Sequence, residues 1–339
     1  MKLISYWHED QDHLAIFHEG RAWKMSELDW RLPDNMELML YAWEDAIELA
    51  TEFNSRILDG TLTHAHPMNA SDLKIIAPVP RPTSMRDAYA FRQHVEAARR
   101  NRKVEMIPEF DQYPIFYFTN HAAVQGPGEI RVMPDHLQKL DFELEVAIVI
   151  GEKGRNIKAA DADKFIAGYM IMNDMSARTL QMEEMKLNLG PAKGKDFSTV
   201  IGPWMVTKDE LEEYKVDCKQ GHTGEAYNLE MTCRVNGTEV SRGNMKDMDW
   251  TFAEIIERAS YGVDLNPGDV IGSGTVGTGC FLELNGTKKL NDPNATEQWL
   301  QAGDTVEMEV TGLGILSNSI VAEETDWSIL ALKKLEIKN

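Results

Sequence analysis

Two apolar, strand-like segments of this chain, residues 140–151 and 171–181, contain acidic side chains. Because side chains alternate faces along an extended strand, Glu143 and Glu145 would point the same way while their apolar neighbours face the opposite layer. Asp174 follows an apolar run and would lie at a strand end. Desolvating unpaired anions is costly, and the usual remedies are a cation, a raised pKa or exposure to water. A hard divalent ion is the simplest cation, because all-oxygen ligands suit Mg²⁺, Ca²⁺ or Mn²⁺.

The alternative is an edge strand that exposes Glu143 and Glu145 on its wet face, which is common in antiparallel sheets. Two alternating glutamates alone favour that alternative, since charges usually stay outside. Asp174 changes the balance, because a third carboxylate at the end of a second apolar segment is what a metal site needs. We therefore predict a divalent-metal site, with Mg²⁺ as the first candidate.

Composition limits the classes of function. The chain has 339 residues, 43% of them hydrophobic, which allows a sizeable core. Its 55 acidic and 35 basic residues give a formal charge of −20, which argues against nucleic acid or an anionic membrane as a partner. Without a signal-peptide core or a membrane-span-length apolar stretch, we expect a cytoplasmic protein. Cys218, Cys233 and Cys280 fit neither a disulfide framework nor a zinc site, so we expect buried thiols.

The order of predicted elements divides the chain near residue 72. Strand-like segments at residues 2–7 and 14–18 precede a segment, residues 36–53, whose apolar residues recur three or four apart and predict a helix. A polar linker follows this helix. We predict a small N-terminal domain at residues 1–71 and a larger C-terminal domain at residues 72–339.

Short strands dominate the larger domain. Asn236-Gly237 between two alternating runs predicts a hairpin with a type I′ turn over residues 231–240. Further strands are predicted at residues 146–150, 200–206, 281–284, 305–310 and 317–322. Helices are predicted at residues 88–101, 160–165 and 250–259. The lack of regular strand and helix alternation favours an α+β, β-rich fold over a doubly wound sheet.

From residue 72 onward the chain resembles the fumarylacetoacetate hydrolase family. The motifs that carry the resemblance are Asp141-Phe-Glu-Leu-Glu-Val-Ala147, Met172-Asn-Asp-Met-Ser-Ala-Arg178, Gly190-Pro-Ala-Lys-Gly-Lys-Asp-Phe197, Gly202-Pro-Trp204, Gly268-Asp-Val-Ile-Gly-Ser-Gly-Thr275 and Phe281-Leu-Glu-Leu-Asn-Gly-Thr287. The resemblance implies a mixed β-sandwich roll of the fumarylacetoacetase type, with the N-terminal residues as a small α/β appendage. It also implies that Glu143, Glu145 and Asp174 bind a divalent cation.

A shorter match lies upstream. Asp87, Tyr89 and His94 have the spacing of a family segment in which the aspartate is the fourth metal ligand, the tyrosine contacts substrate and the histidine is the general base. The alternative for this segment is an amphipathic surface helix. The resemblance gives the histidine a partner, Glu283, which would orient the imidazole and raise its basicity. Glu283 could instead be an exposed strand residue.

Other substrate contacts are implied by the same resemblance. Lys195 would hold a substrate oxygen, although a lysine on a surface turn is the default interpretation. Gln181, Thr275 and Tyr117 correspond to polar substrate contacts. The chain departs from fumarylacetoacetate-cleaving members at two places. Met185 stands where they have a tyrosine, and Arg102 or Lys103 would have to replace an arginine.

Two other patterns in the sequence suggest different functions. Residues 272–277 satisfy the G-x-G-x-x-G pattern, but a nucleotide-binding fingerprint needs a helix directly after the glycines, and a strand is predicted there. The basic run at residues 99–103 is typical of a solvated helix end on so acidic a chain.

The resemblance implies a homodimeric hydrolase that cleaves a carbon–carbon bond in an anionic 1,3-dicarbonyl acid, such as fumarylacetoacetate or an acylpyruvate, in aromatic catabolism. Decarboxylation, isomerisation or hydration of related 2-oxo or 2-hydroxydienoic acids stays open, because these reactions need the same enolate stabilisation. A metal-dependent binding protein without turnover is the alternative from another class.

Overall fold

The computed structural model describes residues 1–333, and one twelve-stranded mixed sheet runs through them. Its strands follow the order β4-β3-β2-β1-β15-β13-β11-β21-β6-β7, with β5 beside β1 and β8 beside β15. The strands are β1 (Lys2–His8), β2 (Gln11–His18), β3 (Arg21–Lys24), β4 (Met68–Asn69), β5 (Lys74–Ile75), β6 (Met85–Ala88), β7 (Phe116–Phe118), β8 (Val124–Gln125), β11 (Leu144–Ile150), β13 (Ile166–Asp174), β15 (Thr199–Val206) and β21 (Val270–Gly272).

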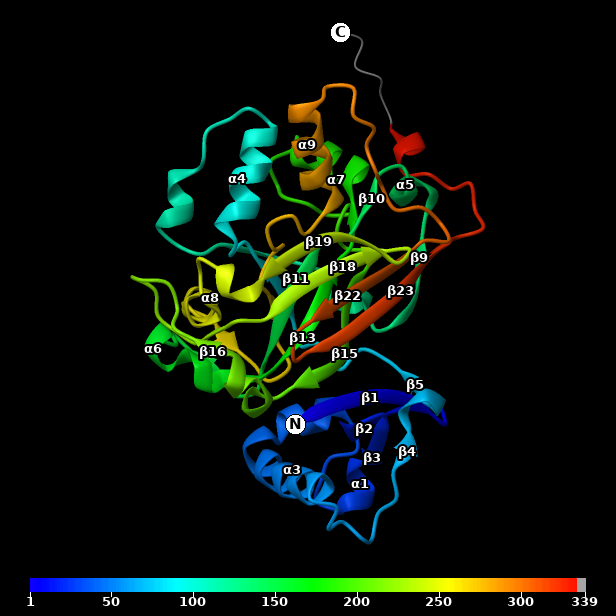
Figure 1. Cartoon of the computed structure of the whole chain (residues 1–339), viewed down its shortest axis with the longest axis vertical. Helices are drawn as coiled ribbons and strands as arrows, with labels where there is room; N and C mark the ends of the chain where they lie inside the picture. The colour runs from blue at the N-terminus through cyan, green and yellow to red at the C-terminus, as the bar shows by residue number, and fades with distance from the viewer. Residues whose placement is uncertain (334–339) are drawn as a thin grey trace.

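A second, five-stranded sheet lies across the central strands (Figure 1) and has the order β19-β18-β22-β23-β9. Its strands are β9 (Gly128–Val132), β18 (Glu230–Val235), β19 (Thr238–Asn244), β22 (Thr305–Val310) and β23 (Gly314–Ala322). The predicted hairpin is confirmed, because β18 pairs with β19 and both Asn236 and Gly237 have positive φ. Three two-stranded pieces complete the strands, namely β10 (Leu140–Asp141) with β14 (Ser176–Ala177), β12 (Gly154–Arg155) with β20 (Asp264–Leu265), and β16 (Lys215–Val216) with β17 (Ala226–Tyr227).

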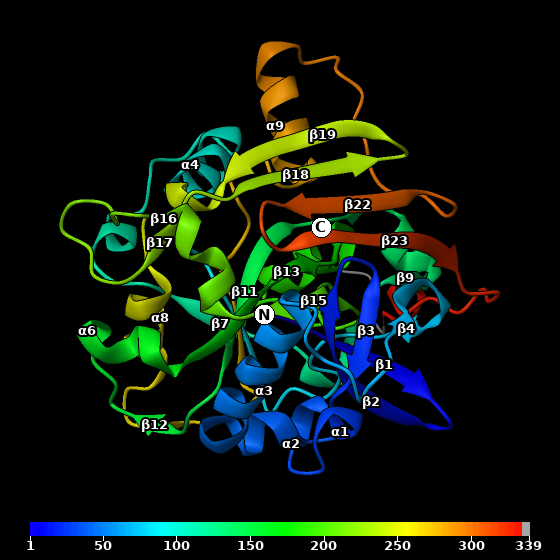
Figure 2. The same cartoon turned by 60° about the horizontal axis from the view of Figure 1, so that its bottom comes forward.

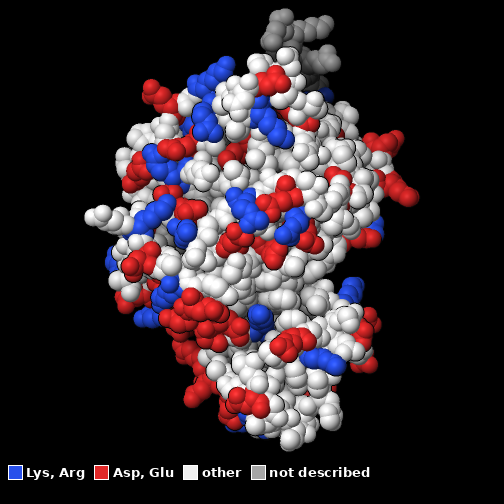
Figure 3. Space-filling view, in the orientation of Figure 1, with Lys and Arg blue, Asp and Glu red and all other residues white. Residues whose placement is uncertain are grey.

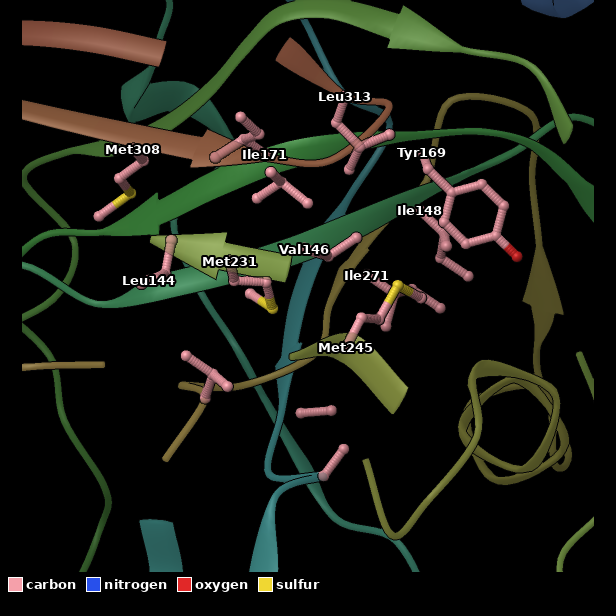
Figure 4. Close-up of a cluster of buried hydrophobic side chains, with 14 of the residues drawn as sticks. Leu144, Val146, Ile148, Tyr169, Ile171, Met231, Met245, Ile271, Met308 and Leu313 are labelled. Carbon is pink, nitrogen blue, oxygen red and sulfur yellow. The ribbon is translucent and has the colours of Figure 1, made fainter. Parts of the chain in front are cut away.

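The main core lies between the two sheets. Figure 4 shows Val146 and Ile148 of β11 near Ile171 of β13, with Met231 of β18 and Met308 of β22 supplied by the other sheet. This two-layer packing confirms the β-rich, sandwich-like fold class.

A second core covers the opposite face of the central sheet. Ala147 and Val149 belong to it, while Val146 and Ile148 belong to the first core. Strands buried on both faces read as nearly continuous apolar runs. Glu145 shares the face of Ala147 and Val149 by its place in the alternation, so it interrupts a buried surface and does not lie on a wet edge.

The N-terminal residues form a unit at the bottom of Figure 1, seen end-on in Figure 2. Three helices pack on its strands, namely α1 (Met25–Leu28), α2 (Met36–Tyr41) and α3 (Trp43–Leu58). The predicted single helix at 36–53 is interrupted at Ala42, which ends α2 and precedes α3. The central sheet continues across residue 72, since β1 pairs with β15. The division into two domains therefore stays a proposal.

The remaining helices lie around the rim of the two sheets. They are α4 (Arg92–Asn101), α5 (Pro134–Leu137), α6 (Ala159–Ala162), α7 (Arg178–Met185), α8 (Phe252–Ala259) and α9 (Phe281–Asn291). None of the helices within residues 1–333 is both long and apolar enough to cross a membrane. Cys233 and Cys280 are buried as expected, whereas Cys218 is partly exposed.

Two element predictions were wrong. Residues 281–284 were predicted as a strand but begin α9. The Asp141 carboxylate accepts hydrogen bonds from the Phe281 and Leu282 amides, at 2.7 and 3.0 Å, and so satisfies the first free donors of that helix. The predicted helix at 88–101 begins only at Arg92, because residues 85–88 pair with β21 as β6.

Candidate active site

Four carboxylates from one region of the central sheet converge at one point. Asp87 lies on β6, Glu145 on β11 and Asp174 at the end of β13, and Glu143 lies just before β11. One oxygen from each lies within 4.8 Å of the others, and all four side chains are buried. The sheet order β13-β11-β21-β6 produces this convergence. Asp87 extends from a strand that ends one residue later, at Ala88.

The carboxylates are held by a small set of donors. The Lys195 ammonium contacts both Glu143 and Asp174, the latter at 2.6 Å, and the Tyr117 hydroxyl donates to Asp174 Oδ2 at 2.6 Å. Lys195 belongs to a turn between α7 and β15. This turn approaches α7 closely, because a Cβ on Gly194 would lie 2.6 Å from the Gln181 backbone nitrogen. The lysine is thereby brought from the surface into the site.

The glycine-rich run at residues 272–277 contacts the same carboxylates. The Gly274 amide donates to Asp87 and Glu145, at 3.1 Å each, and the Thr275 hydroxyl lies 3.4 Å from Glu145. A side chain at Gly272 would come within 2.6 Å of Asp87 Oδ1, and one at Gly274 within 2.5 Å of a backbone oxygen. The glycines therefore allow the backbone to approach the carboxylates, and the resemblance to a nucleotide fingerprint is accidental.

The electrostatics of the cluster fit a divalent cation. Burial and the neighbouring carboxylates raise the pKa of both Asp87 and Glu145 well above their ordinary values. Burial also raises the pKa of Glu143, but Lys195 and Arg178 outweigh this effect and lower it to about 2. Asp174 Oδ1 is buried and finds no hydrogen-bond partner among the described residues. Four hard oxygen donors with so little positive charge among them match the ligand chemistry of Mg²⁺, Ca²⁺ or Mn²⁺.

A histidine–glutamate pair lies beside this cluster. His94 Nδ1 and Glu283 Oε2 are 2.7 Å apart, and both side chains are buried. The Thr278 amide donates to the other Glu283 oxygen at 3.0 Å, and the Asn101 side chain donates to the Glu283 backbone oxygen, also at 3.0 Å. Because α4 carries the histidine and α9 the glutamate, the predicted pair meets across two helices (Figure 1). If Nδ1 donates to the glutamate, Nε2 is left as an acceptor.

Two residues that the sequence analysis did not select connect these parts. Arg178 donates to Glu143 at 2.7 Å, to Asp141 at 2.8 Å and to Gln181 at 2.9 Å. Asp141 in turn accepts hydrogen bonds from the first two amides of α9, the helix that carries Glu283. Both lie within the quoted motifs. The signal that selected Glu143, a charge within an apolar segment, would have found them too.

One cavity of about 920 Å³ joins the cluster and the pair. It is lined by the predicted residues Asp87, Tyr89, His94, Tyr117, Glu143, Gln181, Lys195, Thr275 and Glu283. Burial raises the pKa of Tyr89 to about 12, so its hydroxyl stays a donor at neutral pH. Of the residues at the two departures, Met185 and Arg102 line the cavity. On the face shown in Figure 3, acidic and basic side chains alternate over the upper part, and a continuous acidic patch lies at the lower left.

Residues 83–321 match the family described as fumarylacetoacetate (FAA) hydrolase, C-terminal. The chain belongs to this family. The fumarylacetoacetate hydrolase relatives include the mitochondrial oxaloacetate tautomerase fahd2 of Xenopus laevis, which is 30% identical over 95% of this chain and 90% of its own length. A fumarylacetoacetase of Oryza sativa is 35% identical over 59% of this chain and 56% of its own length. The solved structure of a fumarylacetoacetate hydrolase from Exiguobacterium antarcticum shares the fold, with a TM-score of 0.68 and 22% identity over 95% of this chain and all of that one.

Proposed function

We propose that this protein is a metal-dependent hydrolase that cleaves a carbon–carbon bond in a 1,3-dicarbonyl acid of the fumarylacetoacetate or acylpyruvate type. The observation that carries the proposal is the buried His94–Glu283 pair, which lines the same cavity as Asp87 and Glu143 of the four convergent carboxylates. A carboxylate-oriented histidine beside a cation site supplies a group that can activate water for attack on a carbonyl.

The cation would be held by Asp87, Glu143, Glu145 and Asp174, with Mg²⁺ as the first candidate and Ca²⁺ or Mn²⁺ as others. When bound, it would supply Lewis-acid polarisation of the substrate's carbonyl oxygens, which is worth several kcal/mol.

The protein's own residues would perform the proton transfers. His94 Nε2 accepts a proton from water, and Glu283 stabilises the resulting imidazolium. The hydroxide forms a bond to one carbonyl carbon, and collapse of the tetrahedral adduct breaks the bond to the neighbouring carbon. The electron pair leaves on that carbon as an enolate, which takes up the proton from His94. Lys195, whose pKa is raised by Asp174 and Glu143 despite the opposing effect of burial, donates a charged hydrogen bond to developing negative charge.

A second candidate is keto–enol tautomerisation of a 2-oxo dicarboxylic acid. It is favoured by the Xenopus laevis relative, which matches nearly the whole chain and is named an oxaloacetate tautomerase. That reaction moves a proton between carbon and oxygen and leaves every carbon–carbon bond intact. His94 could serve as its proton acceptor, so only the products separate the two candidates. Homodimer formation stays a prediction in either case.

Product analysis with labelled water tests the proposal. The protein with Mg²⁺ is incubated with acetylpyruvate, fumarylacetoacetate and oxaloacetate in H₂¹⁸O. Hydrolysis produces two fragments, and the new carboxylate of one of them carries the label. Equilibration of enol and keto oxaloacetate without fragments from either dicarbonyl would favour the tautomerase. His94→Asn should slow fragment formation by about 100- to 1,000-fold, and intact turnover in that variant would contradict hydrolysis.

A further inference from the structure

The cavity is much larger than a small dicarbonyl acid requires. Its volume of about 920 Å³ is near the upper end for small-molecule sites, which commonly enclose about 300–1,000 Å³. The carboxylate cluster and the His94–Glu283 pair occupy its inner end. A four-carbon acid bound there would leave most of the remaining space to water.

One face of α7 forms a wall of this cavity and changes character along its length. Arg178, Gln181, Met182 and Met185 all line the cavity, and their spacing of three, four and seven residues places them on one helical stripe. The stripe begins at the Arg178–Glu143 contact and ends at Met185. Seven residues of helix rise by roughly 10 Å. The stripe therefore becomes apolar at Met182, roughly 6 Å along the helix from Arg178, and stays so to Met185, although the neighbouring Glu183 also lines the cavity.

Apolar side chains from other elements also line the cavity. With the two methionines they are Ile115, Phe116, Leu282 and Trp299. Met182 and Met185 are each 46% exposed, and Ile115 is 48% exposed. Apolar surface left in contact with water inside a cavity is stabilised when a ligand covers it. Because these apolar side chains line the same cavity as Asp87 and Glu143, the ligand that they would contact is the substrate itself.

Four basic side chains also line the cavity, and each of them already has a partner within the protein. Lys139 and Lys289 both bind Glu297, at 2.8 and 2.5 Å, which leaves one net charge for the three groups. Arg99 and Arg102 each donate to a backbone oxygen, at 2.6 and 3.1 Å. The Lys139 and Lys289 side chains are 44% and 45% exposed, so water as well as Glu297 surrounds their charged groups.

We propose that this wall binds an extended apolar substituent of the substrate, so that the preferred dicarbonyl acid is an acylpyruvate with a medium-length alkyl or an aryl group on its acyl side. This inference rests on the proposed function and specifies its substrate class. The charged inner end binds the dicarbonyl acid, and Met182 and Met185 contact the substituent.

The test is a series of acylpyruvates with acetyl, butanoyl, hexanoyl and benzoyl groups, with succinylpyruvate as the competing anionic substituent. Burial of one methylene corresponds to about a 3- to 4-fold gain, so kcat/KM should rise roughly 100-fold from acetyl to hexanoyl. Met185→Ser should reduce that ratio about 10-fold. Leu187→Ser is the matched control, because Leu187 is 81% exposed on the adjoining segment and does not line the cavity. This control should keep the whole series unchanged.

A flat series, or a preference for succinylpyruvate over hexanoylpyruvate, would overturn the inference while leaving hydrolysis intact. If no acylpyruvate is cleaved, the proposed function fails, and binding then tests the inference separately. Calorimetry with Mg²⁺ should show 2-oxooctanoate binding at least about 10-fold more tightly than 2-oxobutanoate. It should also show Met185→Ser removing most of this difference. Equal affinities would contradict an apolar subsite.

Discussion

The carboxylate cluster and the His94–Glu283 pair are built differently. Asp87, Glu145 and Asp174 extend from strands of a twelve-stranded sheet, where backbone ladders hold them. The His94–Glu283 pair belongs to two helices, and it depends on a few side-chain hydrogen bonds. The position of the carboxylates is therefore set by the sheet, whereas the pair can be altered without disturbing it. Substitutions should separate metal binding from proton transfer.

The largest effect is expected at the carboxylate cluster. Glu145→Gln and Asp174→Asn should each lower turnover by more than about 1,000-fold, because the cation's electrostatic contribution is several kcal/mol. Without the ion, Glu145→Gln should be at least as stable as the parent, since it relieves repulsion among buried carboxylates, whereas Asp174→Asn also breaks the ion pair with Lys195 and should be less stable. Scanning calorimetry with and without Mg²⁺ would show the parent's Tm rising and the variants' Tm unchanged. Glu239→Gln, on an exposed strand residue, is the control.

A smaller loss of activity with intact metal binding is expected at the His94–Glu283 pair. His94→Asn should lower kcat by about 100- to 1,000-fold, because general-base catalysis typically contributes a factor of this order. The Mg²⁺-dependent rise in Tm should persist, since the four carboxylates remain. His121→Asn, at an exposed histidine outside the cavity, should have no effect. Loss of the Mg²⁺ response in His94→Asn would show that metal binding by the carboxylate cluster depends on the His94–Glu283 pair.

The connection between the two regions should appear mainly in stability. Asp141 is fully buried, where it pairs with Arg178 and accepts a hydrogen bond from the first amide of α9. Asp141→Ala therefore leaves a buried guanidinium with one partner fewer. We expect a loss of about 3–5 kcal/mol in the free energy of unfolding. Urea denaturation would measure it. Asp264→Ala, which breaks exposed ion pairs with Lys153 and Arg155, should cost less than about 1 kcal/mol.

The smallest effect concerns acid stability beside the Lys195 turn. His136 stacks on Phe197 and accepts a hydrogen bond from the Met133 amide at 3.2 Å. Burial, followed by the charge of Lys193, lowers its pKa to about 4. Between this value and the ordinary pKa of about 6.5, the unfolded chain binds a proton that the folded chain does not. Stability should therefore fall as the pH drops through that window, by up to about 3 kcal/mol.

His136→Gln keeps a hydrogen-bond acceptor without the titration. Urea unfolding at pH 8, 6.5 and 5 should show a shallower decline in this variant than in the parent. Equal declines in both proteins would assign the acid sensitivity to other groups.

The local patterns were most informative where one physical constraint dominated. Alternation predicted the strand-like segment that contains Glu145, because side chains alternate faces in any strand. The apolar run before Asp174 predicted that this residue lies at a strand end. Alternation misplaced residues 281–284, whose Leu-Glu-Leu pattern suits a strand. Their helix depends on the carboxylate of Asp141, which is 140 residues away from Phe281. Likewise, the start of α4 at Arg92 was set by the pairing of β6 with β21, and no local signal marks that pairing.

By itself, the sequence determined which side chains are costly to bury alone: Glu143, Glu145 and Asp174 within apolar strands, and His94 with Glu283 through the family resemblance. Only the tertiary structure decided that the carboxylates converge beside the His94–Glu283 pair, that Arg178 and Asp141 connect the two, and that Met182 and Met185 line the same cavity. The physical reason is that alternation and helical periodicity are properties of adjacent residues. The distance between two charges, in contrast, depends on sheet order and helix packing, which are set by contacts remote in the chain.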